Sequence, residues 1–371
     1  MTNASETRDM LDQAFEQMLA RHHSSEDLCE GRSKTDLWEH IVELGLPAAE
    51  LPEDRGGLDV SFADLAPSLR LSGRVLATTY LIEFSVMGAW LVNACAGDGE
   101  AVLLEQAAAG EARIALAQAE PGDGGDLDFI RTTAGPAGEG WIVNGGKSLV
   151  VGGDRATHFV VSARLEDGLD ELGLLLVPVD AAGLTRHCFE LYDGSHAADL
   201  SFEAMACPAA SLLARGEEAR VLLELALDRG RAALAHEMVG LIETVQEITL
   251  DYVKTRKQFG QPIGAFQTMQ HRMADIWMEL ELARSCAHMA TDAIASDSTP
   301  EARQQTVSAA MASICNHARN VGQSAVQAHG GIALTREYLV GHYFKRLTMA
   351  QRYLGNPDMH LDRYVALALQ H

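Results

Sequence analysis

An arginine-containing turn late in the chain has the chemistry to grip a phosphate. The run Arg256-Lys257-Gln258-Phe259-Gly260 follows a predicted helix and ends in a glycine, which permits a sharp turn. The planar guanidinium of Arg256 can donate two hydrogen bonds at once to a phosphate, and Gln267 follows within reach of an adenine. The competing interpretation is structural, because a basic helix C-terminus is stabilised by its own dipole. The residues alone leave both interpretations open.

A glycine pair further along the chain could serve the same ligand. It ends the run Gln327-Ala328-His329-Gly330-Gly331. Paired glycines let the backbone approach a ligand closely and expose N–H donors. The alternative is an ordinary helix C-cap.

Two segments that contain these motifs together resemble the C-terminal helical domain of the acyl-CoA dehydrogenase family. They are TRKQFGQPIGAFQTMQHRMAD (residues 255–275) and QAHGGIALTREYLVGHYFKR (residues 327–346). That family uses FAD to desaturate acyl-CoA thioesters. The resemblance implies that this region binds the ADP half of FAD across a subunit interface. The implied residues are Arg256 on the pyrophosphate, Phe259 and Gln267 on the adenosine side, and Gln327, Gly330 and Gly331 as the second half of the site.

The same resemblance implies a CoA-binding role for Asp228 and Arg231. Both belong to the run Asp228-Arg229-Gly230-Arg231, at the start of the helix that leads toward Arg256. The structural alternative is an aspartate near a helix N-terminus with an arginine on the surface.

The run Gln118-Ala119-Glu120-Pro121-Gly122-Asp123-Gly124-Gly125-Asp126 is similar to the family's flavin loop, usually Thr-Glu-Pro-Gly-x-Gly-Ser-Asp. Alanine and glycine replace the usual threonine and serine. The Trp-x-Thr that normally covers the flavin falls on Leu149 and Val151. Three hydroxyls are therefore absent, which predicts a differently tuned flavin that depends on backbone N–H groups. The implied flavin-side residues are Gln118, Ala119, Gly124, Gly125, Leu149 and Val151.

The family's catalytic carboxylate is missing from both of its usual positions. In the family a glutamate removes the α-proton while hydride leaves the β-carbon for the flavin. Its position falls on Leu354, and the alternative position used by a minority of members falls on Gly230. Asp358 and His360 lie nearby, but a base must come within about 3 Å of the proton it removes. The resemblance also counts Gly355 among the acyl-CoA contacts.

The chain is thus predicted to be an acyl-CoA dehydrogenase subunit that binds FAD and an acyl-CoA substrate. YLVGHYFKRLTM and YLGNPDMHL are similar to small subunits of pimeloyl-CoA dehydrogenase and of bacterial steroid side-chain dehydrogenases. Some such subunits work beside an unlike subunit that carries the glutamate. The implied partners are electron-transfer flavoprotein or a similar acceptor, and further subunits in a homo- or hetero-oligomeric dimer of dimers. Two alternatives stay open: a non-catalytic subunit that completes a partner's FAD site, and CoA-thioester elimination without a dedicated base.

The elements that must position these residues are predicted to be helical, then β, then helical. A Pro/Gly-rich loop, Leu44 to Val60, interrupts the first helical region. Short apolar runs bounded by Gly, Asp or Pro indicate strands from about Arg113 to Arg215, and Asn144-Gly145 predicts a hairpin turn. Long apolar stripes at helical spacing follow, one of them after a Thr299 N-cap. The expected fold is α+β: an α-helical domain (1–112), a β-sandwich or barrel domain (113–215) and a four-helix bundle (216–371) of the acyl-CoA dehydrogenase type.

Bulk composition excludes several classes of partner. The 371 residues carry a formal net charge of −23, which argues against nucleic acid and against an anionic membrane surface. The first ten residues are too polar for a signal peptide, and no apolar run approaches the roughly 20 residues needed to span a bilayer. Scattered cysteines predict no metal site and reduced thiols in a cytoplasmic protein. They are Cys29, Cys95, Cys188, Cys207, Cys286 and Cys315.

Overall fold

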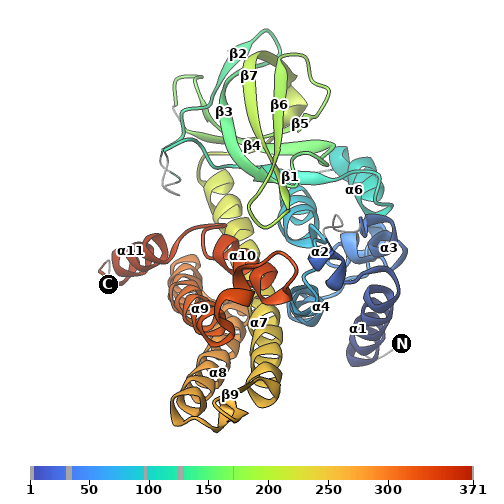
Figure 1. Cartoon of the computed structure of the whole chain (residues 1–371). Helices are drawn as coiled ribbons and strands as arrows, with labels where there is room; N and C mark the ends of the chain where they lie inside the picture. Colours follow the sequence, from blue (N-terminus) through green and yellow to red (C-terminus); the bar gives the residue numbers. More distant parts are fainter. Residues whose placement is uncertain are drawn as a thin grey trace. The chain divides into compact units, whose positions relative to one another are not determined.

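The computed structural model describes residues 4–30, 36–95, 98–122, 127, 129–169 and 171–369 (Figure 1). The predicted order of a helical region, a β domain and a second helical region is confirmed. Contacts gather the described residues into two compact units. One draws on 1–37, 62–79 and 231–371, and the other on 38–61 and 80–230. The domain boundaries at 112 and 215 remain a proposal.

The N-terminal helices divide between the two units. The first unit contains α1 (Ala4–His22), α2 (Glu26–Cys29) and α4 (Phe62–Arg74). The second contains α3 (Trp38–Glu43), a π-helical segment (Ile82–Ala89), α5 (Trp90–Cys95) and α6 (Ala101–Ala108). The predicted loop between residues 44 and 60 is confirmed as turns and short 3₁₀ segments.

The β domain is one sheet in the order β6-β7-β3-β2-β4-β5-β8, with β1 beside β4. Strands β1 and β2 run parallel to β4, and the other neighbours are antiparallel. Their bounds are β1 (Ile114–Ala117), β2 (Thr133–Ala137), β3 (Gly140–Val151), β4 (His158–Leu165), β5 (Leu172–Pro178), β6 (Leu184–Glu190), β7 (His196–Pro208) and β8 (Leu212–Arg215). Apolar runs such as His158 to Ala163 lie on the strands that they predicted.

The hairpin predicted at Asn144-Gly145 is wrong. Both residues lie inside β3, and the turn that joins β2 to β3 is Gly138-Glu139. Gly145 has φ 130° beside Thr132, where a Cβ would approach the Thr132 Cα to 2.7 Å. The Asn144 side chain accepts a hydrogen bond from the Ala204 N–H at 2.8 Å, across a register shift in the β3–β7 pair. Tertiary contacts therefore use this dipeptide in an irregular strand.

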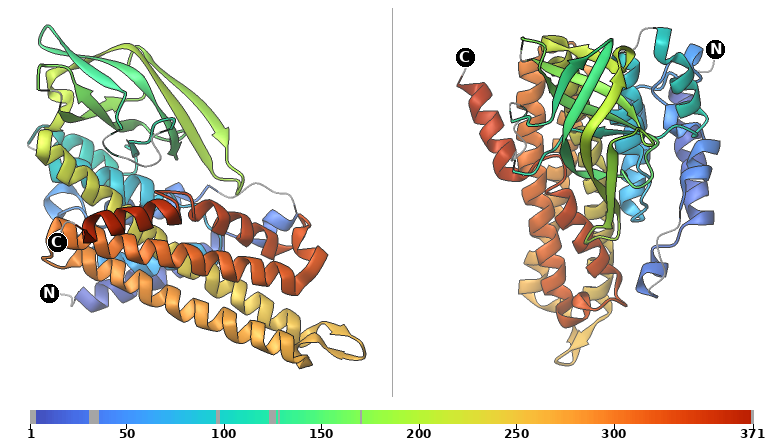
Figure 2. Two further views of the ribbon diagram at one scale, coloured as in Figure 1. Left: turned by 90° about the vertical axis from the view of Figure 1, so that its left-hand side faces the viewer. Right: turned by 90° about the horizontal axis from the view of Figure 1, so that it is seen from above.

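Long helices form the C-terminal region, and most positions of their predicted stripes are buried, while some, among them Tyr252, Met269 and Ala328, are half-buried. They are α7 (Gly216–Thr255), α8 (Gln267–Ala295), α9 (Pro300–His329), α10 (Leu339–Ala350) and α11 (Pro357–Ala368). The predicted N-cap is confirmed, because the Thr299 side chain accepts a hydrogen bond from the Ala302 N–H. Helix α9 packs against α8, α10 and α11 (Figure 2). Of the helices that the structure describes, none is both long and apolar enough to cross a bilayer.

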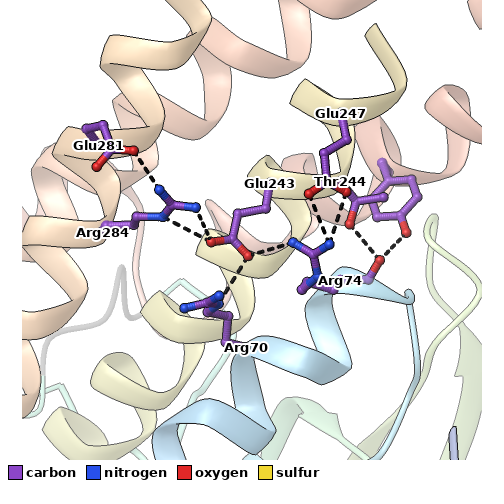
Figure 3. Close-up of polar contacts among 8 residues, drawn as sticks. Arg70, Arg74, Glu243, Thr244, Glu247, Glu281 and Arg284 are labelled. Carbon is purple, nitrogen blue, oxygen red and sulfur yellow. Dashed lines mark hydrogen bonds and ion pairs between the residues drawn. The ribbon is translucent and has the colours of Figure 1, made fainter. Parts of the chain in front are cut away.

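A buried carboxylate ties α4 and α8 to α7 (Figure 3). Glycines allow α4 and α7 to approach closely, since a Cβ on Gly240 would lie 1.9 Å from the Arg70 carbonyl oxygen. Glu243 is 1% exposed and receives hydrogen bonds from Arg70 and Arg74 of α4 at 3.1 Å each. Arg284 of α8 donates to its other oxygen at 2.7 and 3.0 Å. Three cations thus share one carboxylate in the first unit.

Glu243→Gln is expected to destabilise the protein by about 1–3 kcal/mol, because it removes the buried charged acceptor of three arginines. Arg74 and Arg284 are partly exposed and keep their pairs with Glu247 and Glu281, which limits the loss. The matched control is Glu281→Gln. Glu281 is 41% exposed and pairs with the same Arg284, so its loss is expected to cost less than about 1 kcal/mol. Chemical denaturation would measure both. Equal effects from the two variants would contradict the central role of Glu243.

Candidate functional site

The Arg256 segment forms a short hairpin beyond the end of α7 (Figure 2). Strands β9 (Lys257–Gln258) and β10 (Gln261–Pro262) pair antiparallel around Phe259 and Gly260. These two residues have φ values of 53° and 82°, as a two-residue type I′ turn requires. Phe259 is 92% exposed at the tip. A ring this exposed contributes little to its own unit and is free to contact a ligand or another subunit.

An aromatic cluster brings the two phosphate-binding candidates together. The Tyr252 ring, one turn before the hairpin, lies 4.3 Å from the His329 ring at an interplanar angle of 31°. The Tyr338 ring lies 5.2 Å from the His329 ring and 6.4 Å from the Tyr252 ring, so the three rings contact one another. Burial lowers the pKa of His329, which favours the neutral imidazole in this stack. The Gln327–Gly331 run is therefore fixed beside the end of α7, although the two segments are far apart in the sequence.

The polar groups of this region point into open space. The Arg256, Gln267 and Gln327 side chains are all exposed. Gly330 caps α9 with φ 70°, and a Cβ on Gly330 or Gly331 would meet no atom within 4 Å. The Gly330 N–H already donates to the Val326 carbonyl oxygen. An exposed guanidinium, two amides and an uncrowded glycine backbone nevertheless suit a diphosphate. These residues fit the ADP half of FAD chemically.

A groove between α8 and α9 leads to one of these residues. The groove has a volume of about 660 Å³, and Gln327 is one of its lining residues. The other lining residues are Arg272, Asp275, Met278, Glu279, Leu282, Asn320, Gln323 and Ser324. The exposed apolar side chains of Met278 and Leu282 make part of this surface suitable for protein contact.

The two predicted CoA residues are buried on α7. Asp228 is fully buried and Arg231 is 5% exposed. The Arg231 Nε donates a hydrogen bond to the Leu354 carbonyl oxygen at 3.0 Å. Both residues lie in the interior of α7 and not at the start of a helix as the sequence predicted, and Arg231 is not the surface arginine of the structural alternative. The hydrogen bond links α7 to the loop that contains Leu354.

That loop, between α10 and α11, has an unusual backbone. Leu354 has φ 58° and Gly355 φ 118°. The φ of Gly355 favours glycine, because residues with a Cβ rarely adopt it; a Cβ there would also have to displace the flexible end of Met359, whose Cε would lie 2.0 Å away. The Asn356 side chain caps α11 by accepting the Met359 N–H at 2.9 Å. The loop is therefore held in one strained conformation that presents the half-buried Leu354.

The two alternative bases lie in different surroundings. Asp358 is exposed in the first turn of α11, where the helix dipole stabilises its charge. His360 is fully buried on the opposite side of that turn. The His360 ring lies beside the loop, since a Cβ on Gly355 would be 2.9 Å from its Cε1, but the ring is buried. Asp358 is accessible, and no described contact places its carboxylate at the loop.

The flavin-side candidates lie in the second unit, on the loop after β1 and on β3. Gln118 and Ala119 are half-buried, Leu149 is 39% exposed and Val151 is buried. The Ser148 N–H donates to the Ala119 carbonyl oxygen at 2.8 Å, so the loop and the strand lie together. Gly124 and Gly125 lie outside the described residues.

Sequence reasoning missed a buried ion pair beside this loop. The Lys147 Nζ lies 2.6 Å from the Glu120 Oε1, with both side chains almost fully buried. The available signal was a single lysine within the β3 run Trp141 to Val151, which is otherwise without charge. Lysine is rarely buried unless it is paired.

Comparisons with known proteins agree over nearly the whole chain. The family described as acyl-CoA dehydrogenase, C-terminal domain, matches residues 219–367, and acyl-CoA dehydrogenase, middle domain, matches residues 115–205. The probable acyl-CoA dehydrogenase YngJ of Bacillus subtilis is 28% identical over 96% of this chain and 95% of its own length. Among solved structures, a variant of the Tcur3481-Tcur3483 steroid ACAD is 30% identical with a TM-score of 0.87, covering 99% of both chains. An acyl-CoA dehydrogenase from Geobacillus kaustophilus is 26% identical with a TM-score of 0.87, covering 97% of both.

Proposed function

Since the chain belongs to the acyl-CoA dehydrogenase family, whose members carry out FAD-dependent oxidation of acyl-CoA, we propose that it is a subunit without its own catalytic base. In this proposal it binds FAD and a CoA thioester and works beside a subunit that carries the glutamate. The observation that carries the proposal is Leu354, an aliphatic side chain on a loop whose backbone is strained at φ 58° and accepts a hydrogen bond from Arg231.

The ADP half of FAD is assigned to the exposed groups at the ends of α7 and α9. Arg256 would hold the pyrophosphate, Phe259 and Gln267 the adenosine, and Gln327 with the Gly330-Gly331 backbone the remaining phosphate oxygens. The exposure of the hairpin supports a site shared with another subunit, because these groups project away from their own helices. The name of the steroid ACAD relative joins two designations, Tcur3481 and Tcur3483, which fits a hetero-oligomer.

When bound, FAD supplies an acceptor for the hydride that leaves the acyl β-carbon. The chain's own residues orient the reactants. Asp228 and Arg231 are proposed to serve the CoA thioester end, and Arg231 also fixes the Leu354-Gly355 backbone. No group on Leu354 or Gly230 can take the α-proton, and Asp358 faces solvent. Proton removal is therefore the step that this chain leaves to a partner.

The residues at the flavin-side positions favour a second candidate function, that of a structural subunit. Ala119 and Val151 replace hydroxyl-bearing residues of the family, in addition to the lost carboxylate. A chain that has lost all of these could act as a structural subunit that lends only Arg256, Gln267 and Gln327 to a partner's FAD. Such a subunit would keep the hairpin and bind no acyl-CoA.

Absorption spectroscopy separates these functions. The chain is purified alone and together with the product of the neighbouring gene. A flavin band in both preparations, bleached by acyl-CoA only in the second, is the expected result. If the flavin band of the joint preparation corresponds to one FAD per partner subunit and none for this chain, the structural-subunit function would be favoured. Rapid bleaching by the chain alone would contradict the absence of a base.

A further inference from the structure

Strand β3 carries a bulge at the flavin-side candidates. Lys147 pairs with Leu200 of β7, and Val150 pairs with Ala198. Two residues of β3, Ser148 and Leu149, therefore lie opposite the single residue Asp199. This two-against-one arrangement is a β-bulge, a feature that re-aims side chains and occurs often beside active sites.

The bulge redirects two backbone N–H groups away from the β3–β7 ladder. The Ser148 N–H donates to the Ala119 carbonyl oxygen at 2.8 Å. The Leu149 N–H donates to the Asp199 Oδ1 at 2.9 Å. Leu149 has φ 53°, a conformation that a residue with a Cβ adopts only when its surroundings hold it there. The Asp199 carboxylate supplies one such constraint.

Lys147 fixes the other side of the bulge. Its buried ammonium donates to the Gln118 carbonyl oxygen at 3.1 Å and to the Glu120 carboxylate at 2.6 Å. Glu120 also accepts the N–H groups of Arg131 at 2.8 Å and Thr132 at 3.1 Å. Burial acts to raise the pKa of Glu120, but the hydrogen bond and charge of Lys147 together with the hydrogen bonds from Thr132 and Arg131 outweigh it, so the pKa of Glu120 is lowered.

Three consecutive loop residues are thus held by two consecutive strand residues. Gln118 and Glu120 bind the Lys147 side chain, and Ala119 binds the Ser148 backbone. A loop that lacks the family's side-chain hydroxyls can present a defined surface to a flavin only through its backbone. Such a backbone surface keeps a defined shape only if neighbouring side chains hold the loop on the side away from the flavin.

We propose that Lys147 and Asp199 are positioning residues that hold the 118–120 loop and the Ser148-Leu149 bulge in the shape that receives the flavin. This inference rests on the proposed function, because it takes this surface as the flavin side of the FAD site. Neither side chain needs to touch the cofactor.

The test uses the full chain with Lys147→Met, Asp199→Ala and Asp199→Asn. The matched control is Arg164→Met on β4, whose exposed ion pair with Glu166 spans 3.5 Å. Hydrogen exchange is measured first without FAD. Amides of residues 118–120 and 148–149 are expected to exchange at least about tenfold faster in Lys147→Met and Asp199→Ala, because their local opening is less costly. Asp199→Asn keeps an acceptor oxygen and is expected to restore most of the protection.

FAD titration follows, with the visible spectrum and the reduction potential of bound FAD as readouts. Lys147→Met and Asp199→Ala are expected to bind FAD more weakly and to shift its spectrum and potential, while Arg164→Met matches the parent chain. Unchanged flavin spectrum, potential and affinity in a folded Asp199→Ala would overturn the inference, even if Lys147→Met fails to fold. A parent chain that binds no FAD, alone or with its partner, would instead defeat the proposed function on which the inference rests.

Discussion

Leu354→Glu is expected to increase the rate of flavin reduction by a saturated acyl-CoA by roughly 10²–10⁴-fold, the usual contribution of a correctly placed general base. On the proposed function, the substitution introduces a carboxylate at the position to which the sequence resemblance assigns the family's glutamate. The measurement is the rate at which the flavin band bleaches after rapid mixing with acyl-CoA, in the chain with its FAD bound.

The loop is suited to accept this change. Leu354 already has φ 58°, so glutamate at this position adds little backbone strain beyond what leucine carries. The Arg231 hydrogen bond is made to the carbonyl oxygen of residue 354 and does not depend on the side chain. Gly355 and the Asn356 cap are likewise untouched. The side chain is half-buried, so the carboxylate remains partly accessible to solvent and can ionise.

Leu354→Gln is the matched control, because it has the same shape and polarity without a basic group. Its rate is expected to equal that of the parent chain. Brisk activity of the unmodified chain would identify another base, with Asp358 the first to replace. A Leu354→Glu variant that binds FAD and acyl-CoA without any gain would favour the structural-subunit function, since the flavin side would then be deficient as well.

The sequence predicted the helical framework well because its signals are local and agree with the packing. One apolar stripe recurs at helical spacing and is buried on α7, so its periodicity alone predicts the helix. Its residues are Ala235, Met238, Ile242, Val245 and Thr249. The Thr299 cap likewise depends only on its own first turn. These elements suffice to identify the two helix ends on which the FAD candidates stand.

The contacts that shape the site could not be predicted in the same way. Asn144-Gly145 has the composition of a hairpin turn, yet its partners are Thr132 and Ala204, which the dipeptide alone does not specify. The Arg231 contact with the Leu354 carbonyl joins residues 123 positions apart. Lys147 was overlooked because its partner Glu120 is remote and its burial follows from the sheet register. Long-range pairing decides such features, and single-sequence patterns do not encode it.

The exposed end of α7 yields the second large expectation. Arg256→Ala is expected to weaken FAD binding by roughly 10²–10⁴-fold. The reason is that hydrogen bonds to a charged group contribute about 1.5–3 kcal/mol each, and a guanidinium makes two of them to a pyrophosphate. Isothermal titration with FAD measures the affinity, and the flavin content of the purified chain provides an independent check. The FAD affinity of Arg256→Lys is expected to lie between those of the parent chain and Arg256→Ala, because lysine keeps the positive charge but lacks the planar guanidinium.

The control for this substitution is Lys254→Ala, which removes an exposed cation from the last turn of the same helix. It tests whether any positive charge at this end of α7 is enough to attract the FAD pyrophosphate to a chain whose net charge is −23.

The FAD-free melting temperature of Arg256→Ala should match that of the FAD-free parent, because the Arg256 side chain is exposed. With FAD added, only the parent and Lys254→Ala should gain stability, since a ligand stabilises the fold in proportion to its occupancy of the native state. Unchanged FAD content in Arg256→Ala, or an equal loss in Lys254→Ala, would remove Arg256 from the pyrophosphate site and return the hairpin to a purely structural role.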